Sequence, residues 1–170
     1  MARFTIAPGR SRLWVEARSS LHPIKAESAQ LQGYIEAEMA SSGLDLKVQP
    51  QARIEVAVES LKTGNVLYDR EVERQLEVRK YPRIRGEVVE VTELDAGRRY
   101  RVRGNLSLHG VTKTVQGEVT VRVVDGGALE FEGEQIFDIR DFGLTPPRIL
   151  MLKVYPEVKV RGRVVAEKQA

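Results

Sequence analysis

The residues that could carry out chemistry are few and scattered. The chain has two histidines, His22 and His109, and neither has an acidic residue or a second histidine at a spacing typical of a metal site. His109 is expected in a turn between two strands, in a structural or solvent-facing role. The chain has no cysteine, which excludes disulfides, thiol catalysis and cysteine metal sites. We therefore predict no metal and no cofactor.

Two short motifs suggest catalysis only superficially. Asp141-Phe142-Gly143 matches the metal-binding triplet of protein kinases, but the glycine-rich loop and the catalytic loop that give it meaning are missing, so we interpret it as a structural turn. Ser19, Ser20 and His22 could supply a nucleophile and a base, yet neighbours in a loop are usually solvated polar residues. We predict no catalytic residues, with hydrolase or lipid-modifying activity as the least favoured alternative.

Composition excludes several other classes. A chain of 170 residues fits a single domain spanning 1–170. Its 27 basic and 24 acidic residues give a net charge of +3, a weaker bias than nucleic-acid binders show. No run approaches the ~18 apolar residues of a membrane span. Met1 to Arg10 lacks a hydrophobic signal core. We expect a cytoplasmic protein if Met1 is the natural start, and a periplasmic or secreted one if a signal has been removed.

Glycines recur within stretches that alternate apolar and polar residues. A strand has a period of two, so these glycines are expected to face one common interior together with the apolar residues two positions away. Glycine weakens a strand but permits the coiling that a closed sheet needs, and it removes bulk from the interior. The pattern favours a closed antiparallel barrel of about eight strands, with a lumen that is either hollow or filled by side chains. The glycines are Gly33, Gly86, Gly104, Gly117, Gly133 and Gly162.

The same periodicity places the individual elements. Residues 65–80 are expected to form a helix, and a second short helix is expected to begin at Thr145. The polar segment from Ser19 to Gln30 is expected to be a loop. A change of apolar phase between Val88 and Val89 indicates a β-bulge, and residues 95–97 and 125–127 are expected to be hairpin turns. Strands are predicted around Leu13 to Ala17 and near 30–40, 51–59, 82–93, 99–109, 114–124, 128–139 and 154–166.

Several segments together resemble the YceI-like family. They occur in the order Phe4-Thr5-Ile6-Ala7-Pro8, Ser60 to Gly64, Tyr81 to Ile84, Gly104 to Lys113 and Asp141 to Gly143, and the Gly104 to Lys113 block is the most specific. The resemblance covers almost the whole chain. It implies a lipocalin-like barrel with an apolar tunnel for a polyisoprenoid chain, a polar head near one mouth, and a role in lipid handling rather than catalysis.

Burial of an apolar ligand in such a lumen is energetically plausible without any charged residue. Each five-carbon unit contributes on the order of 2–4 kcal/mol before the entropy cost of association. The expected partner is a long-chain isoprenoid or a similar apolar molecule, and Gly104→Leu or Gly117→Leu should expel it. The predicted ligand-binding residues are Leu13, Val15, Leu31, Gly33, Ile35, Ile54, Val56, Val58, Ile84, Val88, Tyr100, Val102, Gly104, Leu106, Gly117, Val119, Phe131, Phe137, Leu150 and Leu152.

Charged residues alternate outward in blocks, among them Arg99, Arg101 and Arg103 and the run Glu130, Glu132 and Glu134. We expect acidic and basic strands to pair across the outer wall, each pair contributing roughly 0.2–1 kcal/mol. A basic face for lipid headgroups or nucleic acid is the alternative, but the aromatic stacking platform of a single-strand binder is missing. The predicted function is non-catalytic binding, storage or transport of an isoprenoid-type lipid. The alternative is a filled barrel that acts as a stress-associated or protein-interaction scaffold, and a homodimer is possible in either case.

Overall fold

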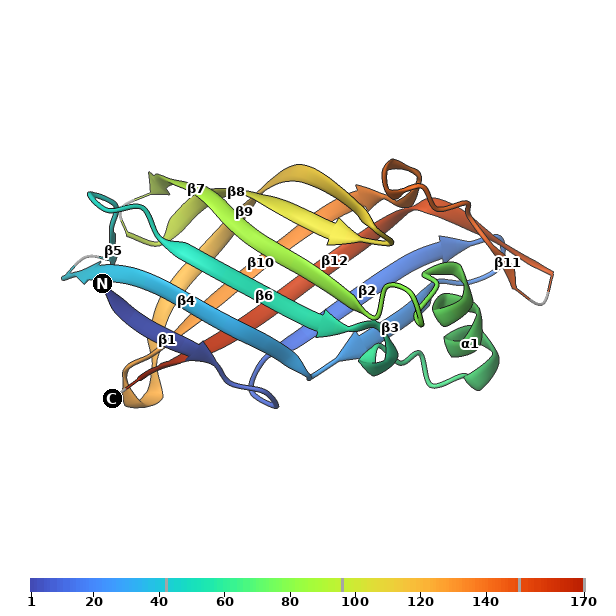
Figure 1. Ribbon diagram of the computed structural model, residues 1–170, viewed down its shortest axis with the longest axis horizontal. Coiled ribbons are helices and arrows are strands. Elements are labelled where there is room, and N and C mark those ends of the chain that lie inside the picture. Colours follow the sequence, from blue (N-terminus) through green and yellow to red (C-terminus); the bar gives the residue numbers. More distant parts are fainter. Residues whose placement is uncertain (42, 96, 150, 170) are drawn as a thin grey trace.

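The computed structural model describes residues 1–41, 43–95, 97–149 and 151–169. Long strands wind obliquely around one axis, and a single α-helix lies at one end (Figure 1). The strands are β1 (Ala2–Ile6), β2 (Arg12–Ser19), β3 (Ile24–Ser28), β4 (Leu31–Ala40), β5 (Gly43–Asp45), β6 (Gln51–Ala57), β7 (Arg83–Asp95), β8 (Arg99–Leu108), β9 (Val111–Val124), β10 (Ala128–Asp138), β11 (Arg148–Ile149) and β12 (Leu152–Lys168). The helices are α1 (Val66–Gln75) and the 3-10 turns η1 (Val58–Ser60), η2 (Asp125–Gly127) and η3 (Ile139–Phe142).

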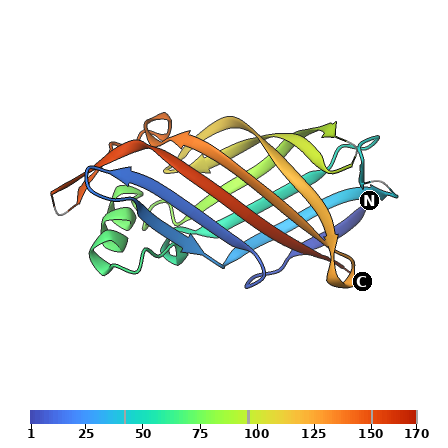
Figure 2. The same ribbon diagram turned by 180° about the vertical axis from the view of Figure 1, so that it is seen from behind.

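The strands form a closed, eight-stranded antiparallel barrel, as the glycine pattern predicts. Strands β6 to β10 and β12 run along the wall in the order β6-β7-β8-β9-β10-β12. The long strand β12 then has two successive neighbours, because its first part pairs with β2 and its last part pairs with β1. The pair β2-β3 therefore completes the ring at the helix end, and β1-β4 completes it at the end that holds both termini (Figure 2). At the helix end, a backbone pair between Glu27 and Lys62 joins β3 to the segment after β6.

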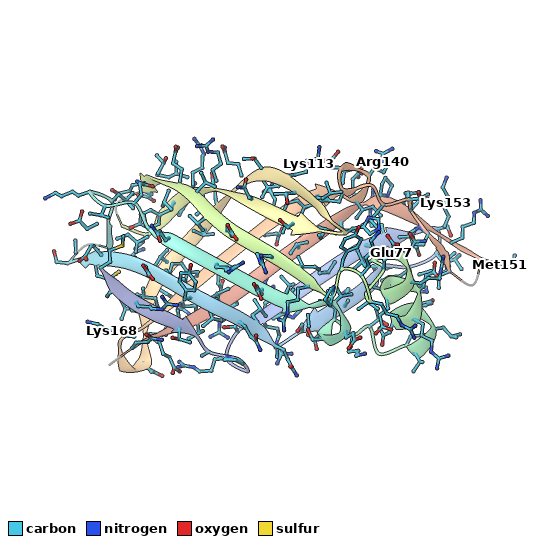
Figure 3. The ribbon with its side chains drawn as sticks, in the orientation of Figure 1. Glu77, Lys113, Arg140, Met151, Lys153 and Lys168 are labelled. Carbon is cyan, nitrogen blue, oxygen red and sulfur yellow. The ribbon has the colours of Figure 1, made fainter. Side chains whose placement is uncertain are left out.

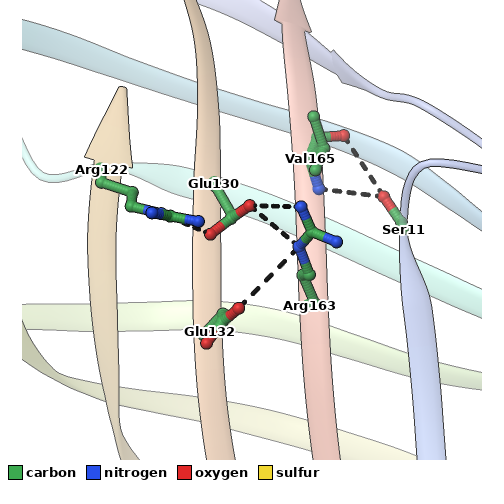
Figure 4. A network of polar contacts seen from close by, with 6 residues as sticks. All are labelled: Ser11, Arg122, Glu130, Glu132, Arg163 and Val165. Atoms are coloured by element: carbon green, nitrogen blue, oxygen red, sulfur yellow. Dashed lines mark hydrogen bonds and ion pairs between the residues drawn. The ribbon is translucent and has the colours of Figure 1, made fainter. Parts of the chain in front are cut away.

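A buried serine fills the point where β12 changes neighbours. Pairing with β2 ends at Arg163, and pairing with β1 resumes at Ala166. Between them, the Ser11 hydroxyl accepts a hydrogen bond from the Val165 backbone N–H at 3.0 Å and donates one to its carbonyl at 3.3 Å (Figure 4). Ser11 is fully buried, so its hydroxyl replaces a strand partner that the backbone would otherwise lack.

Ion pairs cross the outer wall between neighbouring strands, as the alternating charges predict. Arg99 pairs with Glu118 and Arg103 with Glu90, both at 3.0 Å. These pairs are half exposed and contribute little individually. Arg161 makes no ion pair within the described part of the chain, and its guanidinium instead lies 4.3 Å from the ring centroid of Trp14.

Glu130 is the exception on this wall, because its side chain is only 1% exposed. Arg122 donates to Glu130 Oε1 at 2.6 Å, and Arg163 donates to Oε2 at 2.9 Å (Figure 4). The hydrogen bond from Arg122 is the largest influence on the Glu130 pKa and lowers it, with Arg163 adding to the effect, whereas burial acts in the opposite direction. The net result is a Glu130 carboxylate whose pKa lies below its ordinary value.

Helix α1 begins at the Asn65 cap, whose side chain accepts hydrogen bonds from the N–H groups of Leu67 and Tyr68. It ends at Gln75, so it is shorter than the predicted 65–80, and turns follow it to residue 80. The helix packs its apolar side against the barrel end through Leu76 and Val72. It therefore closes that end, together with residues of η3 and the loop that follows it.

Two local predictions are wrong. The segment Ile24–Ser28 is strand β3, which pairs with β2, rather than a loop. The alternating positions Ile24, Ala26 and Ser28 show no clear apolar pattern, because alanine and serine side chains are small. No helix begins at Thr145. Pro147 disfavours helical backbone at the residue before it, and Arg148 and Ile149 pair instead with Lys153 and Leu152 as a hairpin. The predicted bulge is confirmed by a shift of register between Val88 and Glu90.

Candidate functional site

An apolar cavity of about 370 Å³ lies within the barrel. This volume is within the ~300–1,000 Å³ range of small-molecule sites. Inward-facing residues of β4, β6, β7, β8, β9, β10 and β12 form its walls, with Leu13 from β2. The interior is therefore hollow rather than a solid core of interdigitated side chains, and it can accept a slender apolar molecule.

Most of the predicted lining residues do border this cavity. Period-two alternation was sufficient to identify them because each barrel strand keeps one face inward. The predicted residues that lie at the cavity are Leu13, Leu31, Ile35, Ile54, Val88, Tyr100, Val102, Gly104, Leu106, Gly117, Val119, Phe131 and Phe137.

The remaining predicted positions do not border the cavity. Val58 and Ile84 belong to the apolar cluster at the helix end, and Leu152 lies in the β11–β12 hairpin. Val15, Gly33 and Val56 are strand residues outside the lining, and Leu150 is outside the described residues. The lining also includes residues that we did not predict, among them Ala37, Leu44, Pro50, Ala52, Val91, Val115, Val121, Val160 and Val164. Val115, Val160 and Val164 lie two residues from a glycine of the alternating pattern, so this pattern could have identified them.

The cavity is limited at both ends by packed side chains. At the helix end, Val58, Leu76 and Leu144 form a buried cluster. At the opposite end, Val91, Tyr100 and Val121 form another. Tyr100 is fully buried, and its hydroxyl accepts a hydrogen bond from the Leu44 N–H at 3.0 Å, so β5 is held across that end. Neither end of the barrel is therefore a wide mouth.

The side wall between β9 and β10 is incomplete. The two strands pair from Val124 and Ala128 as far as Val119 and Gly133, and they diverge beyond this point (Figure 1). The cavity lining includes consecutive residues along both unpaired edges, Gln116 to Glu118 on β9 and Glu134 and Gln135 on β10. Consecutive residues also border the cavity on the paired strands β7 and β8, at Gly86 to Val88 and Gly104 to Leu106, but there a strand ladder closes the wall. We call this unpaired stretch between the two strands the β9–β10 slit.

The glycines have two different roles in this wall. A Cβ at Gly86 or Gly162 would meet nothing within 4 Å, so these two positions leave space that a side chain could fill. A Cβ at Gly104 would lie 2.5 Å from the Glu87 carbonyl oxygen, and one at Gly33 would lie 1.8 Å from that of Arg53. At these positions glycine permits close approach of neighbouring strands. The prediction that all six glycines open the lumen is therefore wrong for Gly33, which does not border the cavity.

The polar side chains in the described part of the cavity lining are carboxylates, carboxamides and a phenol, such as those of Glu87, Asn105 and Tyr100. None of the lining residues is a lysine, arginine or histidine. His109 lies in the β8–β9 turn, where its Nε2 contacts Glu77 Oε2 at 2.6 Å and its Nδ1 contacts the Phe142 carbonyl oxygen at 3.2 Å. The histidine thus links the turn after α1 to η3. Among the described residues no cluster of acidic residues and histidines could hold a metal ion, and no helix is long and apolar enough to cross a membrane.

The amino-acid sequence places this barrel in a known family. The sequence pattern of the YceI-like domain matches residues 4–166. The chain belongs to the YceI-like family. No curated protein sequence matches this YceI-like chain significantly.

Solved structures agree on the fold of this YceI-like chain. It is similar to BcnA of Burkholderia cenocepacia, with a TM-score of 0.78 and 18% identity over 94% of this chain and 98% of that one. A polyisoprenoid binding domain from Saccharophagus degradans, implicated in plant cell wall breakdown, gives a TM-score of 0.74 with 14% identity over 99% of this chain and 100% of that one. The YceI protein of Campylobacter jejuni gives 0.65 with 14% identity over 86% and 85% of the two chains.

Proposed function

We propose that this YceI-like barrel binds an isoprenoid-type lipid in its cavity and stores or transports it without catalysis. The observation that carries the proposal is the hollow apolar interior, in which Gly86 and Gly162 leave wall positions empty. A branched hydrocarbon chain can bind in such an apolar cavity without polar contacts, since each buried carbon contributes about 0.8 kcal/mol to the binding free energy. The Saccharophagus degradans domain, described as polyisoprenoid binding, supports the same ligand class.

The lining restricts which part of the ligand lies inside. A phosphate or diphosphate head would need a cation, and the described lining supplies none. We therefore propose that the hydrocarbon chain occupies the cavity, whereas a charged head, if present, stays outside. A neutral head could follow the chain inward.

Access to the cavity is proposed to occur through the β9–β10 slit. Packed clusters close both barrel ends, and opening either would require apolar contacts to break. The slit already reaches the cavity along two unpaired strand edges. A lipid inserted through it can keep its head at the rim while its chain enters the lumen.

The proposal is tested by identifying what the protein carries. The protein is purified from its native host without detergent and extracted with organic solvent, and the extract is analysed by mass spectrometry. We expect a prenyl lipid at about one molecule per barrel, and its loss in Gly162→Leu. Thr120→Leu, which places a leucine on the exposed outer face of β9, is the control and should retain the lipid. Extraction of no apolar molecule from the native protein, together with no uptake of added prenyl lipid, would contradict the proposal.

A further inference from the structure

Two hairpin tips lie side by side at the helix end of the barrel. One is the turn between β2 and β3, and the other is the turn between β11 and β12 (Figure 1). The Ser20 N–H donates to the Lys153 carbonyl at 2.9 Å, and the Lys153 N–H donates to the Ser20 hydroxyl at 3.1 Å. These two hydrogen bonds hold the tips together, so they form one projecting unit.

Each tip presents a bare apolar side chain. Leu21 is 80% exposed, and Met151 is 94% exposed and extends at the far end of the molecule (Figure 3). The position of Leu21 is fixed by its own turn, since the Ser19 hydroxyl accepts hydrogen bonds from the N–H groups of Leu21 at 3.4 Å and His22 at 3.1 Å. The backbone of the turn is therefore fixed at Leu21, and the leucine side chain lies in water.

Cations surround these apolar residues. Arg148 and Lys153 are direct cross-strand partners in the β11–β12 hairpin, and like charges in this register are destabilising. Neither forms an ion pair with any carboxylate in the described ranges of the chain. Arg18 and Lys153 both lie 5.9 Å from the ring centroid of Tyr155, and Arg18 reaches a carboxylate only at 4.0 Å, that of Glu157. Arg148 and Lys153, without an ion-pair partner among the described residues, therefore form a positive rim beside the two apolar tips.

We propose that these tips dock the barrel on an anionic lipid surface, with Leu21 and Met151 inserted and Arg18, Arg148 and Lys153 at the headgroups. Apolar residues that penetrate the interface, a tyrosine beside them and flanking cations are the combination that such surfaces bind. A protein partner would require a broad complementary face of about 800 Å² on each side, whereas these residues project from two narrow turns. The purpose of docking rests on the proposed function, because a lipid carrier must meet a membrane to load or unload.

The test measures co-sedimentation with vesicles that contain no isoprenoid. One set is phosphatidylcholine alone, and the other contains about a third phosphatidylglycerol. Binding to the anionic set is expected, with weaker binding to the neutral set. Leu21→Ser with Met151→Ser should reduce binding about tenfold or more, since two apolar side chains no longer leave water. Lys153→Glu should reduce it at least fivefold, because each cation near an anionic surface contributes about that factor.

Two matched controls lie at the opposite end of the barrel. Val123→Ser removes an apolar side chain that is 65% exposed, and Lys168→Glu reverses a cation at that end (Figure 3). Both should bind anionic vesicles within about twofold of the unmodified protein, and all variants should melt as it does. The proposal is overturned if the unmodified protein ignores anionic vesicles, if the tip variants bind normally, or if the controls lose binding equally.

Insertion is measured separately from adsorption. The chain has one tryptophan, so Trp14→Phe with Met151→Trp places a single fluorophore at the tip. A blue shift of its emission on anionic vesicles is expected, and an unchanged spectrum would overturn insertion. Tip variants should still take up a prenyl probe in detergent-free solution. Vesicle binding without probe uptake by the unmodified protein would refute the proposed function alone, whereas probe uptake without vesicle binding would refute docking alone.

Discussion

Gln135 on β10 faces Gly117 on β9 across the β9–β10 slit. Its Oε1 lies 3.5 Å from the position that a Cβ of residue 117 would take, where the two strands have ceased to pair. At this point the rim of the slit consists of Gly117, which has no side chain, and of Gln135. The side-chain amide of Gln135 makes no hydrogen bond with other described residues. Displacing the amide would widen the opening without breaking a strand ladder.

A covalent bridge between positions 117 and 135 should slow the entry and exit of a ligand. The chain has no cysteine, so Gly117→Cys with Gln135→Cys introduces a unique pair of thiols for a short bis(methanethiosulfonate) cross-linker, which forms two reducible disulfides and releases two sulfinate groups. We expect bridging to slow exchange of an apolar fluorescent probe about tenfold or more, because the ligand path is blocked while the binding surface remains. Reduction should restore the rate, as measured by stopped-flow fluorescence.

The control for this bridge is a pair on two strands that are already joined. Asn105 and Thr114 are cross-strand partners of β8 and β9, with Thr114 Oγ1 donating to Asn105 Oδ1 at 3.0 Å. Bridging cysteines there should leave exchange unchanged. Equal exchange rates for the slit pair before and after bridging would mean that the ligand enters elsewhere.

Gly104 and Gly86 should respond differently to the same small substitution. Gly104→Ala places a Cβ against the Glu87 carbonyl and should lower the free energy of unfolding by about 1–3 kcal/mol through strand displacement. Gly86→Ala meets no atom within 4 Å and should change it by less than about 1 kcal/mol, with reduced unfolded-state entropy favouring stabilisation. Urea denaturation measures both. Equal destabilisation would show that Gly86 is also needed for close strand approach. This difference makes Gly104→Leu an unsuitable probe of the lumen, and Gly162→Leu replaces it.

Ser11→Ala should destabilise the barrel at the point where β12 changes neighbours. The substitution removes the acceptor of the buried Val165 N–H, whereas the Val165 carbonyl still receives the Ala7 N–H at 2.8 Å. An unpaired buried donor costs about 1–3 kcal/mol, which thermal or urea unfolding can measure. Ser107→Ala, which removes a hydroxyl at an exposed contact with Thr112, should cost less than about 0.5 kcal/mol. Similar losses of unfolding free energy in the two variants would show that the buried Ser11 hydroxyl contributes no more stability than an exposed hydroxyl.

Acid should weaken the fold partly through Glu130. The Arg122 hydrogen bond lowers the pKa of Glu130 below its ordinary value of 4.5 in the folded state. Its contribution is therefore fully present above the pKa of the unfolded chain and is lost as pH falls through the lower, folded pKa. Glu130→Gln should lower the free energy of unfolding at neutral pH and flatten its decline below about pH 4.5. Glu132→Gln, at an exposed carboxylate on the same strand, is the control, and an unchanged pH profile in Glu130→Gln would contradict this account.

Much of the barrel follows from local pattern, because inward and outward residues alternate on every long strand. Val102, Gly104 and Leu106 could be assigned to the interior, and Arg99 and Arg103 to the outer wall, without knowledge of their partners. Strand β3 escaped prediction because alanine and serine at its inward positions carry little apolar signal.

Features that depend on the distance between strands could not be predicted in this way. Whether a glycine leaves a void, as Gly162 does, or prevents a clash, as Gly104 does, depends on how closely the neighbouring backbone approaches. The slit likewise arises because β9 and β10 separate beyond Val119 and Gly133, while the sequence on either side of that point alternates identically. The exposure of Met151 follows from the hairpin that replaces the predicted helix.

The most direct test of a ligand-binding lumen is a titration of lipid-stripped protein with a fluorescent prenyl probe. We predict saturable binding of about one probe per barrel, affinity reduced about tenfold or more in Gly162→Leu, where the added side chain takes space from the ligand, and unchanged affinity in Thr120→Leu. Failure of the unmodified protein to bind the probe, or equal affinity in Gly162→Leu, would contradict the account.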